Sequence, residues 1–294
     1  MLPAAQVHWF WRTSWLLMAL VGPVYPAFEI TGGGARSSGL GAAFTAGVDA
    51  EAIWFNPAAN AWAQKYRVGT AHAQLYSGLD ESPNLNVLGA VLPLGGGSLQ
   101  LGWSSLGVED WREQVGLVGY GRAFHQRFAL GASLRSSGWE TRGLSHRVWS
   151  ADLGATYKVG WIHRRAYMRL GFMATNINRA NIAASGHPAG KTPRGVVLAA
   201  SVNLDRQQVL VDIERRRGRT EVRIGYETPL SSRTRGVALR LGGQLLSADR
   251  EAKEEDLGLG YRWKQWYFDY AYIHPLHPTG LGGIHRGGFE YRGH

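Results

Sequence analysis

Histidine is the side chain in this sequence best suited to chemistry, and it gathers near the C-terminal end at His274, His277 and His285, with His187 further upstream. Neutral imidazole is a common ligand of zinc and other transition metals. The spacing of these histidines fits neither one face of a helix nor a zinc knuckle, and two prolines stiffen the loop between them. We therefore predict no metal site.

Nucleotide binding and nucleophilic catalysis also lack their usual residues. The stretch from Gly32 to Gly41 has the glycine content of a phosphate-binding loop, but no Gly-Lys-Ser/Thr follows it and no strand-loop-helix unit surrounds it. No nucleophile elbow or matched triad spacing is visible, and the chain contains no cysteine. We predict that the protein is not an enzyme and holds no cofactor.

The chain is basic, with 32 Lys and Arg residues against 22 Asp and Glu residues and a net charge of +10. Such a balance can indicate nucleic-acid binding, but these cations are spread over predicted strand faces and loop tips and form no single stripe. We expect no nucleic-acid partner. The anionic head groups of outer-membrane lipid and lipopolysaccharide are the expected partners of this charge.

The elements that must position these residues are strands, as the segment from Lys253 to His294 indicates. Its bulky residues alternate with small or charged ones: Leu257, Leu259, Tyr261 and Trp263 alternate with Gly258, Gly260, Arg262 and Lys264. A soluble sandwich would place bulky residues inside and would seldom combine so much Tyr and Trp with so much Gly. Strands of about ten residues with an aromatic outer face are typical of a barrel in lipid.

The rest of the chain follows the same pattern, and we predict a closed antiparallel transmembrane β-barrel of about 14 strands. The predicted strands begin at Tyr66, Asn84, Ser98, Glu113, Arg127, Arg147, Arg165, Arg194, Gln207, Thr220, Gly236, Asp256, Trp266 and His285. Short connections are expected to alternate with longer ones, such as Gly138 to Ser145 and Arg179 to Thr192, with the short connection at Arg216 to Gly218 as one exception. This alternation suits an even-stranded outer-membrane barrel with both termini in the periplasm.

Three segments are expected in the chain. Residues 1–27 read as a signal peptide, with Arg12 before an apolar run and Ala27 at a cleavage point. Residues 28–64, rich in Gly and Ala, are expected to form a small hatch, or plug, at the barrel. Residues 65–294 are expected to form the barrel. Within the hatch, Asp49 is predicted to cap a short turn, and Asn56 with Pro57 to start a helix through Ala63.

Charged residues of the later strands fall on the face opposite the large apolar ones. A charge at mid-depth on the lipid face would cost ~2–4 kcal/mol, so these side chains are expected to point into the lumen and to pair across strands. Whether they only fill a narrow barrel or form a constriction that selects what passes is left open. The predicted ladder is Asp212, Glu214, Arg223, Arg240, Arg262, Asp269 and Glu290.

Two motifs resemble a known family. The segment at 34–58 reads G-A-R-S-S-G-L-G-A-A-F-T-A-G-V-D-A-E-A-I-W-F-N-P-A, and the last hairpin contains D-Y-A-Y at 269–272 and L-G-G-I-H-R at 281–286. They are similar to the PorV/PorQ outer-membrane proteins, which belong with the FadL-type fatty-acid channels. The resemblance implies a hatch that contains Gly39, Gly41, Asp49, Asn56 and Pro57. The chain departs from the family by not ending on an aromatic residue.

The resemblance implies a non-enzymatic component of protein export, surface attachment or outer-membrane transport in a bacterial outer membrane, with a secretion-system or surface protein as partner. The alternative is a FadL-like channel for hydrophobic small molecules such as long-chain fatty acids. An apolar ligand would then be expected near the hatch. Its candidate contacts are Phe44, Trp54, Phe55 and Trp62.

Overall fold

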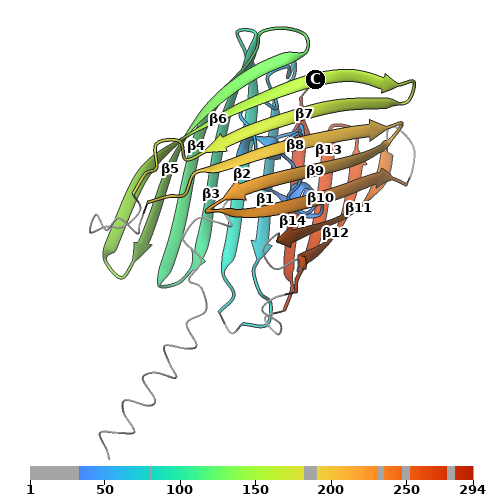
Figure 1. Cartoon of the computed structure of the whole chain (residues 1–294). Coiled ribbons are helices and arrows are strands. Elements are labelled where there is room, and N and C mark those ends of the chain that lie inside the picture. The colour runs from blue at the N-terminus through green and yellow to red at the C-terminus, as the bar shows by residue number, and fades with distance from the viewer. Residues whose placement is uncertain are drawn as a thin grey trace, which may run out of the picture. The chain divides into compact units, whose positions relative to one another are not determined.

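A computed structural model describes residues 33–79, 81–181, 191–230, 235–246, 252–276 and 282–293. The described residues form fourteen strands that close into one antiparallel barrel, each strand pairing with its neighbours in sequence and β14 returning to β1 (Figure 1). The strands are β1 (Arg67–Gln74), β2 (Asn84–Leu94), β3 (Gly97–Val108), β4 (Trp111–Ala123), β5 (Phe128–Thr141), β6 (Leu144–His163), β7 (Ala166–Thr175), β8 (Gly195–Leu204), β9 (Gln207–Arg216), β10 (Arg219–Pro229), β11 (Arg235–Leu246), β12 (Ala252–Trp263), β13 (Trp266–Pro275) and β14 (Ile284–Arg292). The predicted fold is confirmed, and every strand begins within four residues of its predicted start.

The two faces of the wall differ as the alternation predicts. Leu257, Leu259 and Tyr261 are each 46% exposed on the outer face of β12, where lipid would solvate them. Charges such as Asp212 and Arg240 are buried on the inner face. Pairing of β1 with β14, from Arg67 opposite Arg292 to Gln74 opposite His285, leaves the sheet without an edge strand.

Both ends of the barrel sequence lie at one end of the barrel, because β1 begins where β14 finishes. We call this the terminal end and the opposite end the loop end. The turn between β12 and β13 lies at the terminal end, and the β1–β2 connection lies at the loop end.

One predicted loop is wrong. Gly138 to Ser145 was expected to connect two strands, but Gly138–Thr141 belongs to β5 and pairs with residues of β6, leaving only Arg142 and Gly143 as the turn. Both turn residues have positive φ, 36° and 84°, which is the backbone of a two-residue type I′ hairpin. The alternation therefore continues to the hairpin tip. β6 reaches 20 residues, about twice what a bilayer requires.

The contrast between long and short connections is weaker than predicted, because strand pairing continues to two-residue turns at several hairpins of the loop end. At the loop end, the β3–β4, β5–β6 and β9–β10 connections each have two residues. The longer connections at this end join β1 to β2, β7 to β8, β11 to β12 and β13 to β14.

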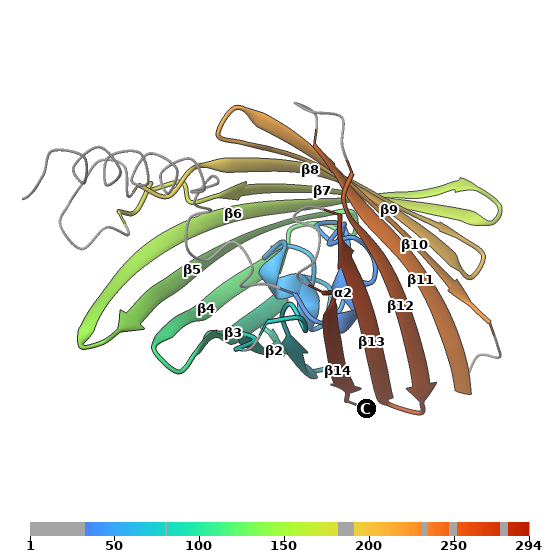
Figure 2. The same ribbon diagram turned by 90° about the horizontal axis from the view of Figure 1, so that it is seen from below.

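The hatch segment lies inside the barrel, where the view along the barrel shows it enclosed by the strands (Figure 2). It contains one turn of α-helix, α2 (Ala35–Ser38), and one 3₁₀ turn, η1 (Glu51–Trp54). α2 contacts β12, β13 and β14, and η1 contacts β2 and β3. Across the described residues, no helix has both the length and the apolar character needed to span a membrane. The predicted signal peptide and the first residues of the hatch lie outside the described residues.

The helix predicted from Asn56 to Ala63 is replaced by a run of turns. Its backbone amides donate three residues back, as Ala59 does to the carbonyl of Asn56 and Ala63 to that of Asn60. The carbonyl of Pro57 accepts 2.6 Å from the Gln100 side-chain amide of β3 and so is committed to the wall. This contact competes with a helical hydrogen bond and accounts for the difference.

Candidate functional site

Inward glycines form the seat of the hatch. At each of ten glycines, one on each of ten strands, an added Cβ would come within 3.1 Å of a hatch atom. Glycine at these positions therefore allows the hatch backbone to approach the wall closely. We call this set the glycine girdle: Gly69, Gly89, Gly102, Gly121, Gly131, Gly154, Gly171, Gly225, Gly242 and Gly258.

The girdle is continuous where neighbouring strands place glycines opposite each other. Gly131 of β5 is paired with Gly121 of β4 and with Gly154 of β6, and all three face the Asn56–Ala58 segment. Across the barrel, Gly225 and Gly242 are register partners that face Leu40–Gly41. A methyl group at Gly242 would overlap the Gly41 backbone, so no side chain fits there while the hatch is in place.

Hydrogen bonds fix the hatch within this seat. One carboxylate oxygen of Asp212 accepts from the backbone amides of Phe44 (3.2 Å) and Thr45 (3.0 Å). The amide of Asn56 donates to the carbonyls of Thr45 (3.0 Å) and of Ala155 in β6 (3.1 Å). Asn56 thus bridges two parts of the hatch and one strand of the wall.

A chain of ion pairs joins the hatch to the later strands. Arg36 binds Asp49 of the hatch at 2.7 Å and Glu227 of β10 at 3.0 Å. Glu227 also binds Arg240 of β11 at 2.5 Å, and Arg240 binds Asp269 of β13 at 2.8 Å. We call these five residues the ion-pair chain. The pair between Arg36 and Glu227 is the one that joins the hatch to the wall, so this pair forms only while the hatch is docked.

Arg36 is the hatch member of this chain that reaches the wall. Burial lowers its pKa, but the carboxylates of Glu227 and Asp49 outweigh burial and raise the pKa well above its usual value. The guanidinium also lies 5.3 Å from the centre of the Phe44 ring. Arg36 is therefore permanently charged, and one of its two carboxylate partners, Glu227, is available only in the docked position.

Glu51 closes the N-terminus of α2, where Gly34 offers no side-chain cap. Its two carboxylate oxygens accept from the backbone amides of Arg36 (3.2 Å) and Ser37 (2.7 Å). Burial and the neighbouring carboxylates of Asp49 and Asp269 raise the pKa of Glu51 from 4.5 to about 7, against the opposing effect of the Ser37 hydrogen bonds. Glu51 therefore titrates near neutral pH.

The predicted lumen ladder divides into separate groups. Arg240 and Asp269 belong to the ion-pair chain, and Asp212 binds the hatch backbone as described above. Glu214 binds Arg223 at 2.5 Å, while Glu290 binds Arg292 at 2.8 Å. Arg262 is apart from all of these, exposed at the terminal end.

The predicted apolar contacts are not brought together in one pocket. Phe44 and Phe55 pack edge to face, 5.5 Å between ring centres, inside the hatch core with Leu40. Trp54 packs against the wall beside Gly102. Trp62 lies at the terminal end, under the ammonium of Lys158 at 3.7 Å, and lines a hollow of about 600 Å³ there.

The predicted hatch-motif residues have structural contacts within the seat. Asp49 accepts from the amides of Glu51 and Ala52 at 2.8 and 3.1 Å. Gly39 lies against the backbone of Gly258, and Gly41, with φ of 64°, lies against β10 and β11.

The histidines do not assemble a metal site among the described residues, where no group of three His, Asp or Glu side chains is placed to hold a metal ion. His285 interacts with the hydroxyl of Tyr270 at 2.7 Å on the outer face. His274 stacks on Tyr272. His187 and His277 lie outside the described residues.

Several contacts that seat the hatch were not predicted from the sequence. They include Arg36, Glu51, Glu227 and the glycine girdle. The girdle has a sequence signal, which is one glycine per strand at an inward position of the alternation. No sequence signal indicates that Arg36 pairs with Glu227, because the two residues are 191 positions apart.

An inward-facing apolar wall lies on the loop-end side of the hatch. It occupies β1 to β4, β13 and β14, continues the inward positions of the girdle toward the loop end, and is buried. Its members are Ala71, Ala73, Leu85, Val87, Leu106, Val115, Ile273 and Ile284. The ion-pair chain lies mainly against β10 and β11 and reaches β13 at Asp269, where it borders this wall. Two further buried charges, Glu113 of β4 and Arg286 of β14, are on strands that also carry the wall.

Comparison with known proteins relates this fold to hydrocarbon channels. No family model matches the sequence, and no curated protein matches it. The toluene transporter TodX of Pseudomonas putida has a TM-score of 0.61 at 12% identity, with 92% of this chain and 100% of that chain covered. The monoaromatic hydrocarbon channel CymD has a TM-score of 0.61 at 14% identity, with 91% and 98% covered. The chain thus shares the barrel fold of these two channels.

Proposed function

We propose that the protein is an outer-membrane channel for hydrophobic small molecules, with the hatch as the closure of its lumen. The observation that carries the proposal is the apolar wall beside the seated hatch. The side chains of this wall are buried in this structure, so an apolar molecule that enters from the loop end would reach them once the groups that cover them move aside. Burial of apolar ligand surface there is favourable by roughly 25 cal/mol per Å².

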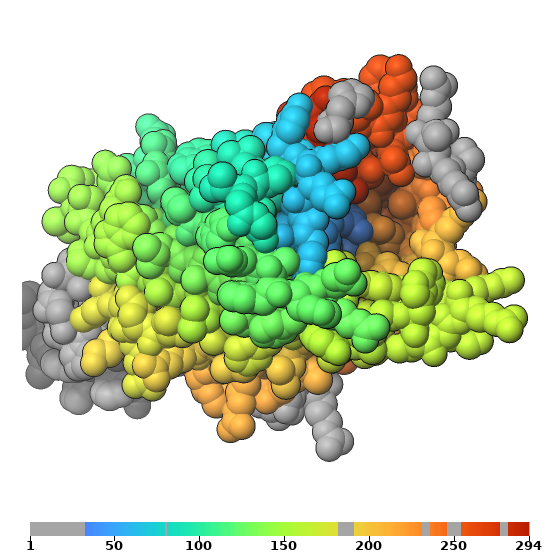
Figure 3. All heavy atoms as spheres, turned by 90° about the horizontal axis from the view of Figure 1, so that it is seen from above, coloured from blue at the N-terminus to red at the C-terminus, as the bar shows by residue number. Residues whose placement is uncertain are grey.

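The hatch fits the role of a closure because it fills the lumen at the level of the girdle. Hatch atoms, dark blue, are visible within the opening between the first and later strands (Figure 3). With backbone against backbone at Gly131 and Gly242, a molecule of ring size has no room to pass between hatch and wall there. Passage to the terminal end, which faces the periplasm in an even-stranded barrel, requires the hatch to shift.

The comparisons support this proposal through the fold. TodX and CymD are channels for toluene and monoaromatic hydrocarbons by description, and at 12–14% identity they inform the architecture and not the ligand. The export or surface-attachment role implied by the PorV/PorQ resemblance gains no support from them and stays a prediction. The ligand class therefore rests on the apolar wall.

The test replaces two adjacent residues that face opposite sides of β2. Val87→Trp would fill the apolar wall, whereas Leu88→Trp would place the same side chain on the lipid face, where Leu88 is 45% exposed. Binding of a tritiated monoaromatic hydrocarbon and of a long-chain fatty acid is measured on purified protein by scintillation proximity.

We expect saturable binding to the wild type and to Leu88→Trp, and a loss of at least tenfold in affinity for Val87→Trp. Equal binding by the two variants would show that the wall is not the binding surface. A protein that copurifies in fixed stoichiometry, with no apolar ligand bound, would instead favour the export role.

A further inference from the structure

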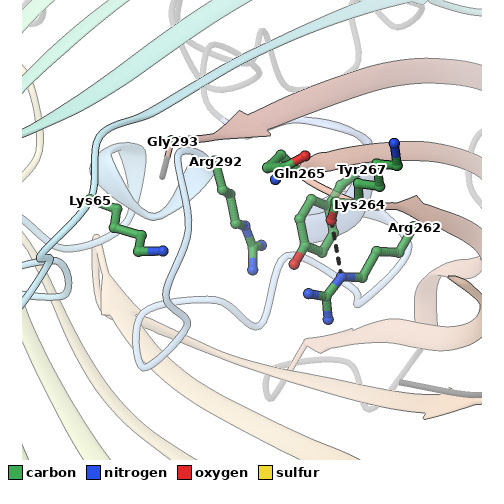
Figure 4. Close-up of a pocket in the computed structure, with 7 residues that line it drawn as sticks. All are labelled: Lys65, Arg262, Lys264, Gln265, Tyr267, Arg292 and Gly293. Carbon is green, nitrogen blue, oxygen red and sulfur yellow. Dashed lines mark hydrogen bonds between the residues drawn. The ribbon is translucent and has the colours of Figure 1, made fainter. Parts of the chain in front are cut away.

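A hollow of about 470 Å³ opens at the terminal end of the barrel, apart from the hatch seat and the ion-pair chain (Figure 4). Its lining is rich in cations and comes from the β12–β13 hairpin, the end of β14 and Lys65, two residues before β1. The lining residues are Lys65, Arg262, Lys264, Gln265, Tyr267, Arg292 and Gly293.

Tyr267 orders the two guanidinium groups of this hollow. Its ring lies 3.8 Å from the guanidinium carbon of Arg292 and 5.2 Å from that of Arg262, which is cation–π distance on both sides. Figure 4 shows Lys65, Arg292, Tyr267 and Arg262 directed toward the same space. The planar donors are therefore held in place before any ligand arrives.

The two arginines differ in the hydrogen-bond acceptors that their guanidinium groups have. Arg292 donates through Nε and Nη2 to the carboxylate of Glu290, at 2.8 and 3.1 Å. Arg262 donates only through Nε, to the carbonyl oxygen of Lys264 at 3.4 Å. Both terminal nitrogens of Arg262 thus have no acceptor within the described part of the chain.

The charge around the hollow is unbalanced. Lys65, Arg67, Arg262 and Arg292 contribute four positive charges and Glu290 one negative charge, which leaves +3. Arg67 lies directly opposite Arg292 in the register, and its Nη1 is buried without a hydrogen-bond partner. Over residues 33–79, 81–181, 191–230, 235–246, 252–276 and 282–293, no carboxylate pairs with Lys65, Arg67 or Arg262.

Lys264 does not add to this charge. Its ammonium lies over the ring of Trp263 at 5.7 Å, on the outer side of the strand, and only its backbone faces Arg262.

A bound oxyanion would accept hydrogen bonds from the terminal nitrogens of Arg262 and would neutralise part of the excess positive charge. Like charges held at one rim repel, and a concave site lined by one sign of charge concentrates counter-ions. A guanidinium with a free fork binds carboxylate or phosphate through two parallel hydrogen bonds. A volume of about 470 Å³ lies in the range of small-molecule sites.

We propose that the hollow between Lys65, Arg262, Tyr267 and Arg292 binds the oxyanion head group, carboxylate or phosphate, of a small molecule at the terminal mouth of the barrel. The site is independent of the ligand that the lumen carries, since it lies outside the apolar wall and the girdle.

The test is isothermal titration calorimetry of the full-length folded barrel in an uncharged maltoside detergent. The probes are inorganic phosphate, hexyl phosphate, hexanoate and the uncharged hexanol. Inorganic phosphate distinguishes a site for the head group alone from one that also needs an alkyl chain. The variants are Arg262→Gln, which removes charge and fork, and Arg262→Lys, which keeps the charge but loses the fork.

Arg165→Gln is the matched control, because it removes one exposed positive charge at the same end of the barrel but outside the hollow. Heat-dependent gel mobility confirms that each variant is a closed barrel.

We expect the anions to bind with an affinity that falls as salt is raised, and hexanol not to bind. Arg262→Gln should weaken anion binding ten- to a hundredfold, Arg262→Lys less, and Arg165→Gln less than twofold. The proposal is overturned if no anion binds, if hexanol binds as tightly as hexanoate, or if Arg262→Gln and Arg165→Gln have equal effects.

Discussion

Replacing Arg36 with Met should release the hatch while leaving the barrel closed. Met keeps an unbranched apolar stem but removes the guanidinium that binds Asp49 and Glu227. The side chain of Arg36 is 14% exposed, so its ion pairs are largely shielded from solvent. Removing one partner of a buried ion pair costs ~3–5 kcal/mol when the remaining charges are left without compensation.

The remaining charges are partly compensated, which lowers that figure. Glu227 keeps Arg240 at 2.5 Å, and Asp49 keeps the backbone amides of Glu51 and Ala52. We therefore take a cost near the lower limit, about 3 kcal/mol. Because each 1.4 kcal/mol is a factor of ten in an equilibrium constant, the open hatch population should rise roughly a hundredfold.

Amide hydrogen exchange followed by mass spectrometry measures this change segment by segment. Residues 33–64 should lose roughly a hundredfold in protection, while the strand amides should exchange as in the wild type. Arg142→Met is the control, since Arg142 forms an ion pair with Asp110 in which the two side chains are 79% and 63% exposed. Exposed pairs of this kind contribute about 0–1 kcal/mol. If Arg36→Met leaves exchange in the hatch unchanged, or if the strands lose protection to the same extent, the ion-pair chain does not hold the hatch.

Three further perturbations test the seat, the wall and the pH response. Gly131→Leu should displace the hatch and raise ion conductance in planar bilayers, because the new Cβ would meet the Pro57 backbone. Gly116→Leu should leave the conductance unchanged, since nothing lies within 4 Å of a Cβ at that position. Equal conductance of the two variants would argue against close contact at the girdle. Leu241→Arg should cost ~2–4 kcal/mol on the lipid face and lower the folded yield well below that of Leu241→Ala. Equal folded yields of the two variants would contradict the lipid-facing position of Leu241. The docked hatch raises the pKa of Glu51 from 4.5 to about 7, so docking binds a proton and is favoured at low pH. As the pH rises from 4.5 to 7, the free energy that protects the hatch amides from exchange should decrease by at most about 3 kcal/mol. Glu51→Gln should remove this pH dependence.

Alternation along single strands carries most of the fold information in this chain. The inward or outward direction of Asp212, Arg240 and Leu241 follows from a period of two, which is a local property. Strand count and order follow in turn, because an antiparallel barrel pairs each strand with its neighbour. The loop at Gly138 to Ser145 was mispredicted because glycine at the tip also suits a two-residue turn.

The seat of the hatch depends on contacts that no local pattern encodes. Arg36 could pair with any lumen carboxylate, and only the closed barrel selects Glu227. Asn56 was predicted to cap a helix that begins at Pro57, but the wall takes the Pro57 carbonyl and the segment forms turns. The aromatic residues Phe44 and Trp54 were predicted as ligand contacts because their burial within the hatch cannot be read from their spacing.

A disulfide between hatch and wall can test whether the hatch must move. Cβ atoms at Ala50 and Gly69 would lie 3.1 Å apart, slightly below the usual range of ~3.5–4.5 Å for a disulfide, so a small relaxation allows the bond in Ala50→Cys/Gly69→Cys. The chain has no other cysteine, and reduction reverses the lock.

The uptake rate of a radiolabelled monoaromatic hydrocarbon by cells that express the protein tests the central claim most directly. Cells with the wild-type protein should take up the compound faster than cells with an empty vector. Cells with the oxidised Ala50→Cys/Gly69→Cys variant should match the empty vector and recover the wild-type rate on reduction. Uptake by wild-type cells no faster than the empty vector, with the barrel folded in the outer membrane, would contradict a channel for hydrophobic molecules, and equal uptake by the oxidised and reduced variant would contradict closure by the hatch.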